Sequence, residues 1–153
     1  MLDLSQIYHI GVTVSSIDRA LDELGAQMGF TWTDVRTLNA RVRMGSRIVE
    51  GSARVAFSRE GPPWFEVIEG PPDTIWAPEQ GIGLHHVGLY VDDLPGEIAR
   101  LERLGMSIET ASIDAEGNLR NFAYLNGFAG MRVELVDVRL KPTLEGWILG
   151  TGS

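Results

Sequence analysis

The chain has 153 residues, 44% of them hydrophobic, and a mean hydropathy close to zero, which is typical of one folded domain and excludes a disordered chain. Its formal net charge is -8, from 13 lysines and arginines against 21 aspartates and glutamates, so binding to nucleic acid is not expected. The sequence has no cysteine, which excludes disulfides, thiolate metal sites and cysteine nucleophiles, and no apolar run approaches the roughly 18 residues of a membrane span.

The N-terminal segment and the cysteine content bear on where the protein works. Residues 1–5 contain no basic region followed by an apolar stretch, so no signal peptide is predicted. The absence of cysteine is compatible with the cytosol. We therefore expect a cytoplasmic protein that binds neither a membrane nor a nucleic acid.

The first half of the chain predicts a strand, then a helix, then several strands. The run 7–14 has five β-branched residues among eight, which favours a strand. Ser15 offers an N-cap for a helix whose apolar residues recur at helical spacing, and Gly29 ends that helix. Strand-like stretches follow, of which the first two could instead form one long bent strand: 31–36, 41–49, 53–57 and 64–68.

The second half repeats this order after a linker over about 71–83 that is rich in proline and glycine. Residues 84–91 predict a strand. Asp92 or Asp93 caps a helix with Pro95 in its first turn, and Gly105 closes it. Further strands are expected at 106–112, 121–125 and 131–138.

Two short phrases occur once in each half. His-Ile-Gly-Val-Thr-Val at 9–14 matches His-Val-Gly-Leu-Tyr-Val at 86–91, and Phe-Glu-Val-Ile-Glu at 65–69 matches Val-Glu-Leu-Val-Asp at 133–137. One domain, 1–153, is therefore expected to contain two copies of a unit, over about 5–70 and about 84–140. The order βαβββ, twice, predicts an α+β fold with a mostly antiparallel sheet and helices on one side.

The repeated phrases place two histidines and two glutamates at equivalent points of the two copies. His9 and His86 open a strand in each copy, and Glu66 and Glu134 stand between apolar residues in a later strand. A carboxylate that points into a core needs a partner, and paired histidine and carboxylate ligands are typical of divalent-metal sites. The sequence therefore predicts a site for one divalent ion, with Zn, Ni, Co, Fe and Mn all compatible with this ligand set.

Other residues could contribute to the site or to a binding surface. His85 precedes the second phrase and points the other way along a strand, so a supporting role is favoured over ligation; Glu69 is the less favoured alternative to Glu66. Three arginines at strand-like spacing indicate either a solvated face, which is favoured, or a landing site for an anionic substrate group: Arg41, Arg43 and Arg47.

The aromatic residues and the tail allow two interpretations each. Four aromatic side chains could line an apolar pocket, although core packing is the favoured use of most of them: Trp32, Phe57, Trp64 and Trp76. The tail after Lys141-Pro142 contains several large apolar residues. It could therefore pack on the body of the protein or against a partner subunit.

From these motifs the chain resembles the vicinal oxygen chelate superfamily, which includes glyoxalase I, methylmalonyl-CoA epimerase, extradiol dioxygenases and bleomycin-resistance proteins. The resemblance covers about residues 7–138, and its carriers are the two His-apolar-Gly-apolar openings and the two apolar-Glu-apolar closings. It implies paired βαβββ modules whose sheets curve into a cup around a metal held by His9, Glu66, His86 and Glu134. It also implies a homodimer and a small-molecule substrate with adjacent oxygens.

Within the superfamily the chain is most similar to the epimerase-like branch, because the segment 50–57 resembles the one that carries a catalytic glutamate in those enzymes. That match makes Glu50 a general base, although a surface position for Glu50 is equally compatible with the sequence. The base is Glu50 or a metal ligand that dissociates during turnover, such as Glu134. The expected activity is metal-dependent removal of a proton next to a carbonyl or thioester, as in an epimerase or isomerase. A glyoxalase I-like lyase and a metal-free small-molecule-binding protein are the alternatives, and Glu66 favours the lyase because epimerases commonly have glutamine there.

Overall fold

The computed structural model describes residues 3–78, 84–127 and 130–151. It contains eight strands, three α-helices and two short 3-10 helices, and the expected α+β class is confirmed. In chain order these elements are η1 (Leu4–Gln6), β1 (Ile7–Thr13), α1 (Ile17–Met28), β2 (Arg36–Met44), β3 (Arg47–Phe57), β4 (Trp64–Glu69), β5 (His86–Val91), α2 (Leu94–Arg103), β6 (Ser107–Ile113), β7 (Leu119–Asn126), β8 (Arg132–Asp137), η2 (Val138–Leu140) and α3 (Lys141–Leu149).

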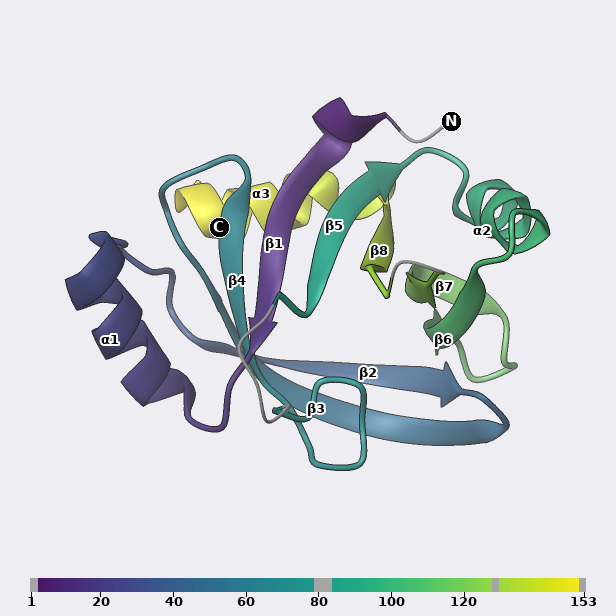
Figure 1. Ribbon diagram of the computed structural model, residues 1–153, viewed down its shortest axis with the longest axis horizontal. Coiled ribbons are helices and arrows are strands. Elements are labelled where there is room, and N and C mark those ends of the chain that lie inside the picture. The colour runs from purple at the N-terminus through teal and green to yellow at the C-terminus, as the bar shows by residue number, and fades with distance from the viewer. Residues whose placement is uncertain (1–2, 79–83, 128–129, 152–153) are drawn as a thin grey trace.

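The strands form one closed barrel in the order β1-β4-β3-β2-β6-β7-β8-β5 (Figure 1). Strands β1 to β4 and strands β5 to β8 are arranged in the same way within their halves. The two halves join through the antiparallel pairs β1–β5 and β2–β6. The pairs β1–β4 and β5–β8 are parallel, and the others are antiparallel. The first strand of each half therefore lies beside the last strand of that half and also beside the first strand of the other.

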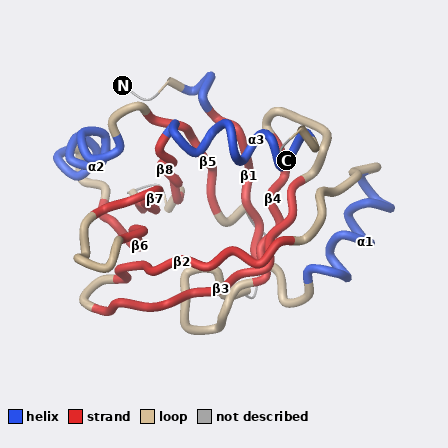
Figure 2. The backbone as a smooth tube through the Cα atoms, turned by 180° about the vertical axis from the view of Figure 1, so that it is seen from behind, coloured by secondary structure: helices blue, strands red, loops and turns tan. Residues whose placement is uncertain are grey.

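Helices α1 and α2 lie outside the barrel and pack on its outer surface (Figures 1 and 2), whereas α3 packs against the interior, where its Leu144 lines the pocket and its Trp147 contacts Phe57. Helix α1 covers one end through Ile17, which packs with Val67 of β4. Helix α2 covers the other end through Leu94, Ile98 and Leu101. Helix α3 runs across β5, β1 and β4 and belongs to the largest buried cluster, which is rich in aromatic residues. In the part of the chain that the structure describes, the helices are too short or too polar to span a membrane.

Several expected element boundaries were wrong. The stretch 41–49 is not one strand, because the chain reverses at Gly45, whose φ of 59° is easily reached by glycine, and continues as β3. The stretch 31–36 contains one isolated bridge, at Trp32, and β2 begins at Arg36. The N-cap of α1 is Ser16 rather than Ser15, whereas the helix does end at Gly29 in the left-handed conformation. Part of the expected linker, 79–83, lies outside the described residues.

Candidate metal centre and pocket

His9, Glu66, His86 and Glu134 meet inside the barrel, one each from β1, β4, β5 and β8. One ligand atom from each residue lies within 4.8 Å of all the others. The Nε2 atoms of His9 and His86 are 2.6 Å apart. Glu66 Oε2 lies 3.3 Å from His9 Nε2 and 3.2 Å from His86 Nε2, and Glu134 Oε2 lies 3.1 Å and 3.5 Å from the same two atoms. The structure thus brings together the four residues expected to bind a metal.

The strand register explains why these four side chains converge. In the β1–β5 pair, His9 stands opposite Gly88, and Gly11 stands opposite His86. A Cβ atom built on Gly88 would lie 2.0 Å from Cε1 of His9, and one built on Gly11 would lie 1.9 Å from Cε1 of His86. Each His-apolar-Gly phrase therefore supplies one imidazole and also the space for the imidazole of the other half.

The electrostatics of the cluster favour a cation at its centre. Burial alone would lower the pKa of His9, but the carboxylates of Glu66 and Glu134 outweigh it and raise that pKa to about 9. Burial likewise opposes ionisation of Glu134, yet His86 and His9 hold its pKa below its usual range. Glu66 Oε2 and His9 Nδ1 are buried without a hydrogen-bond partner. Carboxylates that stay ionised around two facing imidazole nitrogens are suitable ligands for a divalent metal ion.

His85 supports the cluster from outside, as its position before His86 predicts. Its Nε2 lies 2.6 Å from the carbonyl oxygen of Ile75, and its Nδ1 lies 2.8 Å from Nδ1 of His86. A carbonyl can only accept, so His85 Nε2 carries the proton and His85 Nδ1 accepts from His86 Nδ1. This arrangement leaves a lone pair on Nε2 of His86, directed at the cluster. Burial lowers the pKa of His85 to about 4, with help from His86 and Arg132, which keeps its ring neutral.

The structure does not bring Glu50 to the cluster. Its side chain is 70% exposed and accepts a hydrogen bond of 2.7 Å from Arg41. Gly51, Ala53 and Val55 line the interior of the barrel, and side chains alternate along a strand, so Glu50 lies on the outer face of β3. The structure therefore does not place Glu50 beside the metal-binding candidates, because the expected position required Glu50 to lie on the inner face of β3.

Glu69 and the arginines of β2 also point away from the cluster. Glu69 accepts a hydrogen bond of 2.7 Å from the backbone N–H of Ile17 at the start of α1. Arg41 is paired with Glu50, and Arg43 donates to the carbonyl of Gly117 at 2.9 Å. Neither arginine lines the pocket that opens beside the metal-binding candidates.

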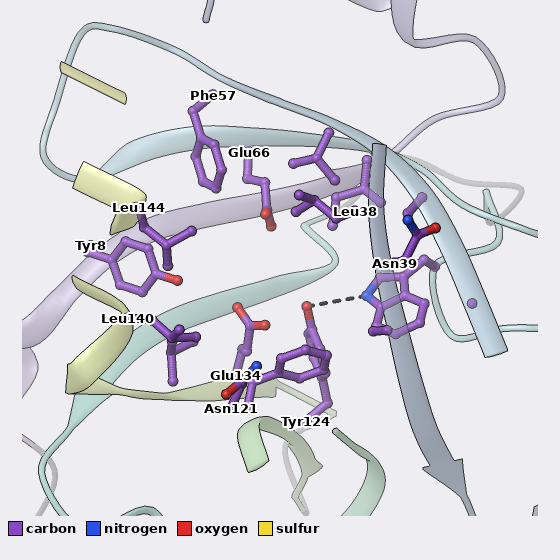
Figure 3. A pocket seen from close by; sticks show the side chains of 18 residues that line it. Tyr8, Leu38, Asn39, Phe57, Glu66, Asn121, Tyr124, Glu134, Leu140 and Leu144 are labelled. Atoms are coloured by element: carbon purple, nitrogen blue, oxygen red, sulfur yellow. Dashed lines mark hydrogen bonds between the residues drawn. The ribbon is translucent and has the colours of Figure 1, made fainter. Parts of the chain in front are cut away.

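This pocket, of about 270 Å³, lies next to Glu66 and Glu134 (Figure 3). Figure 3 shows both carboxylates pointing into it, with Tyr8, Leu140 and Leu144 on one side and Leu38 and Asn39 on the other. Of the four aromatic residues that could line a pocket, two reach this one: Phe57 and Trp76. The full lining is Tyr8, Leu38, Asn39, Ala40, Gly51, Ala53, Val55, Phe57, Glu66, Ile68, Trp76, Asn121, Phe122, Tyr124, Glu134, Val136, Leu140 and Leu144.

Tyr124 is a site residue that no motif in the sequence revealed. It stands opposite Glu134 in the β7–β8 pair, and its hydroxyl accepts a hydrogen bond of 3.2 Å from Nε1 of Trp76, the dashed line in Figure 3. Burial and the charges of Glu134 and Glu66 hold its pKa well above the usual value, so the hydroxyl keeps its proton. Tyr124 can therefore donate a hydrogen bond into the pocket. Phe122 and Tyr124 stand two residues apart in β7 and therefore share one face of the strand, which was the available indication in the sequence. This spacing does not reveal which face is internal.

Comparisons with known proteins agree with this architecture. A methylmalonyl-CoA epimerase variant of Streptomyces coelicolor, in complex with 2-nitronate-propionyl-CoA, is similar with a TM-score of 0.57 and 18% identity, over 86% of this chain and 96% of that one. Methylmalonyl-CoA epimerase from Mycobacterium tuberculosis is similar with a TM-score of 0.55 and 18% identity, over 90% of this chain and 92% of that one. A hypothetical protein from Bacillus halodurans is similar with a TM-score of 0.55 and 20% identity, over 86% of this chain and 92% of that one.

At these identities the structural similarity establishes a common fold. No functionally curated protein matches the sequence. The family model described as glyoxalase/bleomycin resistance protein/dioxygenase superfamily does match, over residues 8–124. This match spans three of the four residues of the buried cluster and most of the chain, so the protein belongs to the glyoxalase/bleomycin resistance protein/dioxygenase superfamily.

Proposed function

We propose that the protein is a divalent-metal-dependent enzyme that removes a proton next to a carbonyl or thioester, with epimerisation or isomerisation as the outcome. The observation that carries this proposal is the convergence of two buried imidazoles and two buried carboxylates beside a mainly apolar pocket. Structural neighbours that are methylmalonyl-CoA epimerases support it as well.

In this proposal His9, Glu66, His86 and Glu134 hold the ion. When bound, a divalent cation supplies Lewis-acid stabilisation of the negative charge that develops on a substrate oxygen. The chain itself supplies the alignment of the ligands. Gly11 and Gly88 leave room for the two rings, and His85 keeps the Nε2 lone pair of His86 directed at the centre.

Glu134 is the side chain that we propose as the base, as the metal ligand that would dissociate during turnover. A base must lie within hydrogen-bond reach of the proton that it removes, and the acidic side chains that line the pocket are Glu66 and Glu134. Both have lowered pKa values in the metal-free protein and are therefore ionised at neutral pH. Tyr124 lies opposite Glu134 and can donate a hydrogen bond to a substrate oxygen while Glu134 accepts the proton.

The proposal is limited to the reaction type and does not extend to the substrate of the neighbours. The methylmalonyl group carries a carboxylate, and no lysine or arginine is among the residues that line this pocket. A glyoxalase I-like lyase would use the same four ligands, so turnover of a thioester against a hemithioacetal separates the two enzymes. Metal content separates both from a metal-free binding protein.

The first test is elemental analysis of the purified protein without a histidine tag, beside the His86→Ala variant. We expect about one divalent ion per chain, lost in the variant because one of the four ligands is missing. The metal-loaded protein is then incubated in deuterated water with a panel of thioesters and hemithioacetals, and exchange of the proton next to the carbonyl is followed by NMR. Glu134→Ala should abolish metal binding and exchange together. Exchange that survives in this variant would remove Glu134 from the mechanism, and protein that takes up no ion would refute the enzyme proposal.

A further inference from the structure

We propose that the pocket selects a compact substrate with one oxygen-bearing end and an uncharged, apolar or aromatic body. This inference rests on the proposed function, because the oxygen-bearing end is the one placed at the metal. It goes further in naming the charge and the size of the molecule that the pocket accepts. Three observations carry it: the charge balance of the lining, its polarity from one end to the other, and its volume.

The charges of the side chains that line the pocket exclude a substrate whose body is negatively charged. The charged side chains among the residues that line the pocket are Glu66 and Glu134, and both are negative. A divalent ion would neutralise these two carboxylates, so the occupied site would have no net positive charge to offer a second anion. A carboxylate on the part of the substrate away from the ion, where it cannot coordinate the metal, would therefore be buried without a partner, which is strongly unfavourable.

Cationic side chains near the pocket are already engaged elsewhere. Arg36, on β2, lies over the ring of Trp147 at 4.7 Å from its centroid, and Lys141, on α3, lies 5.4 Å from the centroid of Tyr90. Arg41 is held by Glu50 on the outer face of the barrel. These contacts orient positive charge toward aromatic rings and outer carboxylates rather than into the pocket.

The polarity of the lining changes along the pocket. The Glu66 and Glu134 carboxylates and the Tyr124 hydroxyl mark one polar position, and Figure 3 shows the three oxygens directed toward the same region. The remaining surface is mostly apolar, with the hydroxyl of Tyr8 and the amides of Asn39 and Asn121 among the uncharged exceptions. A ligand with oxygen atoms at one end and a hydrocarbon or aromatic body matches this distribution.

The volume sets the size of the ligand. An engineered protein cavity of about 150 Å³ holds one benzene molecule. The pocket of about 270 Å³ is therefore large enough for an aromatic ring and a short side chain, or for roughly 10–15 non-hydrogen atoms. A larger substrate would have to leave the rest of its structure outside the barrel.

The binding of two probes of equal size tests whether the pocket selects against a negatively charged substrate body. The first, called the diketone here, is uncharged 1-(4-nitrophenyl)propane-1,2-dione. The second, called the anion, is 4-(2-oxopropanoyl)benzoate, which has the same number of non-hydrogen atoms but a carboxylate in place of the nitro group, at the end of the ring away from the two oxygens that face the ion. Binding of each to the metal-loaded protein is measured by calorimetry and by the change in tryptophan fluorescence, to which Trp76 in the pocket contributes. We expect the diketone to bind at least about tenfold more tightly than the anion, because the pocket offers the carboxylate no counter-charge.

A variant that adds a cation should reverse this preference. Leu38 lines the pocket and is 41% exposed, so Leu38→Arg should be tolerated by the fold. It should strengthen the binding of the anion and weaken or leave unchanged that of the diketone. Leu104→Arg is the matched control, because Leu104 is 71% exposed at the end of α2 and does not line the pocket.

The outcomes separate this inference from the proposed function. Equal or tighter binding of the anion by the unmodified protein would overturn the inference, and so would failure of the diketone to bind a protein that holds its metal. Loss of proton exchange with intact selection for uncharged probes would instead overturn the enzyme proposal. A Leu38→Arg variant that prefers the anion, beside an unchanged Leu104→Arg control, would support the inference.

Discussion

Replacing Gly88 by alanine should disable the metal centre without touching a ligand. The new Cβ would lie 2.0 Å from Cε1 of His9, so the ring must move by about 1.4 Å to reach an ordinary contact distance of 3.4 Å. His9 is fully buried against Phe57 and His86, which leaves little room for that movement. Metal sites tolerate displacements of about 0.2 Å in their ligands, so we expect metal affinity to fall by about 100-fold or more. The added methyl group should also cost about 1–3 kcal/mol of folding stability.

The assay is calorimetric titration with a divalent ion, together with thermal unfolding of each protein without metal. Gly51→Ala is the matched control, since Gly51 is also a strand glycine and its Cβ would meet Trp76 at an ordinary distance of 3.6 Å. Addition of His9→Ala to the Gly88→Ala variant should recover part of the lost stability, because the displaced ring is gone, but should not restore metal binding. Unchanged metal affinity in Gly88→Ala would refute the argument that the glycines make room for the ligands.

Three further predictions concern the same site. In the folded protein the pKa of His9 is raised from 6.5 to about 9, so protonated His9 should contribute fully to the free energy of unfolding of the metal-free protein below pH 6.5. Up to about 3 kcal/mol of this contribution should be lost as the pH rises through 9. Urea unfolding at several pH values measures the change, and a free energy of unfolding that rises over that range would contradict the prediction. Tyr124→Phe should keep metal affinity within about threefold but lower the rate of proton exchange by about tenfold or more, since the donor into the pocket is lost; an unchanged rate would exclude that role. Glu50→Gln should leave metal affinity and proton exchange unchanged, because Glu50 lies on the outer face, and loss of exchange with metal retained would return it to the site.

The repeated phrases predicted the four metal-binding candidates because sequence repetition and strand pairing coincide in this fold. His9 and His86 occupy the same position in the repeated phrase, and the strands that carry them are neighbours in the closed barrel. Glu66 and Glu134 then follow from the parallel pairs, which place each glutamate opposite a glycine of the His-apolar-Gly phrase: Gly11 opposite Glu66 and Gly88 opposite Glu134. A residue pattern at equivalent points of two copies is therefore informative about distance even when the copies are far apart in sequence.

Glu50 was expected in the site but lies on the outer face of β3, because the sequence did not reveal which residues of this strand face inward. Which residues of β3 face inward depends on the position of the reversal at Gly45, since a shift of one residue exchanges the two faces of a strand. The stretch 41–49 around this turn resembled one continuous strand, so the face on which each of its residues lies could not be assigned. Glu50 was matched by resemblance of the surrounding segment and not by register. Tyr124 was missed for a related reason, because its position opposite Glu134 arises from long-range pairing.

The energetics of the cluster give an independent reason to expect a bound ligand. Two carboxylates and two imidazoles are buried together in a barrel whose other inner residues are largely apolar. Buried polar clusters of this kind are often no more stabilising than apolar side chains of similar volume, since the loss of hydration offsets the attraction between the charges. Here the hydrogen bonding is also incomplete, as Glu66 Oε2 and His9 Nδ1 have no partner. Two glycines are in addition placed so that both rings fit. A fold that required only a stable interior would be served better by apolar residues at these positions, so the arrangement favours a site that could hold an ion over a purely structural cluster.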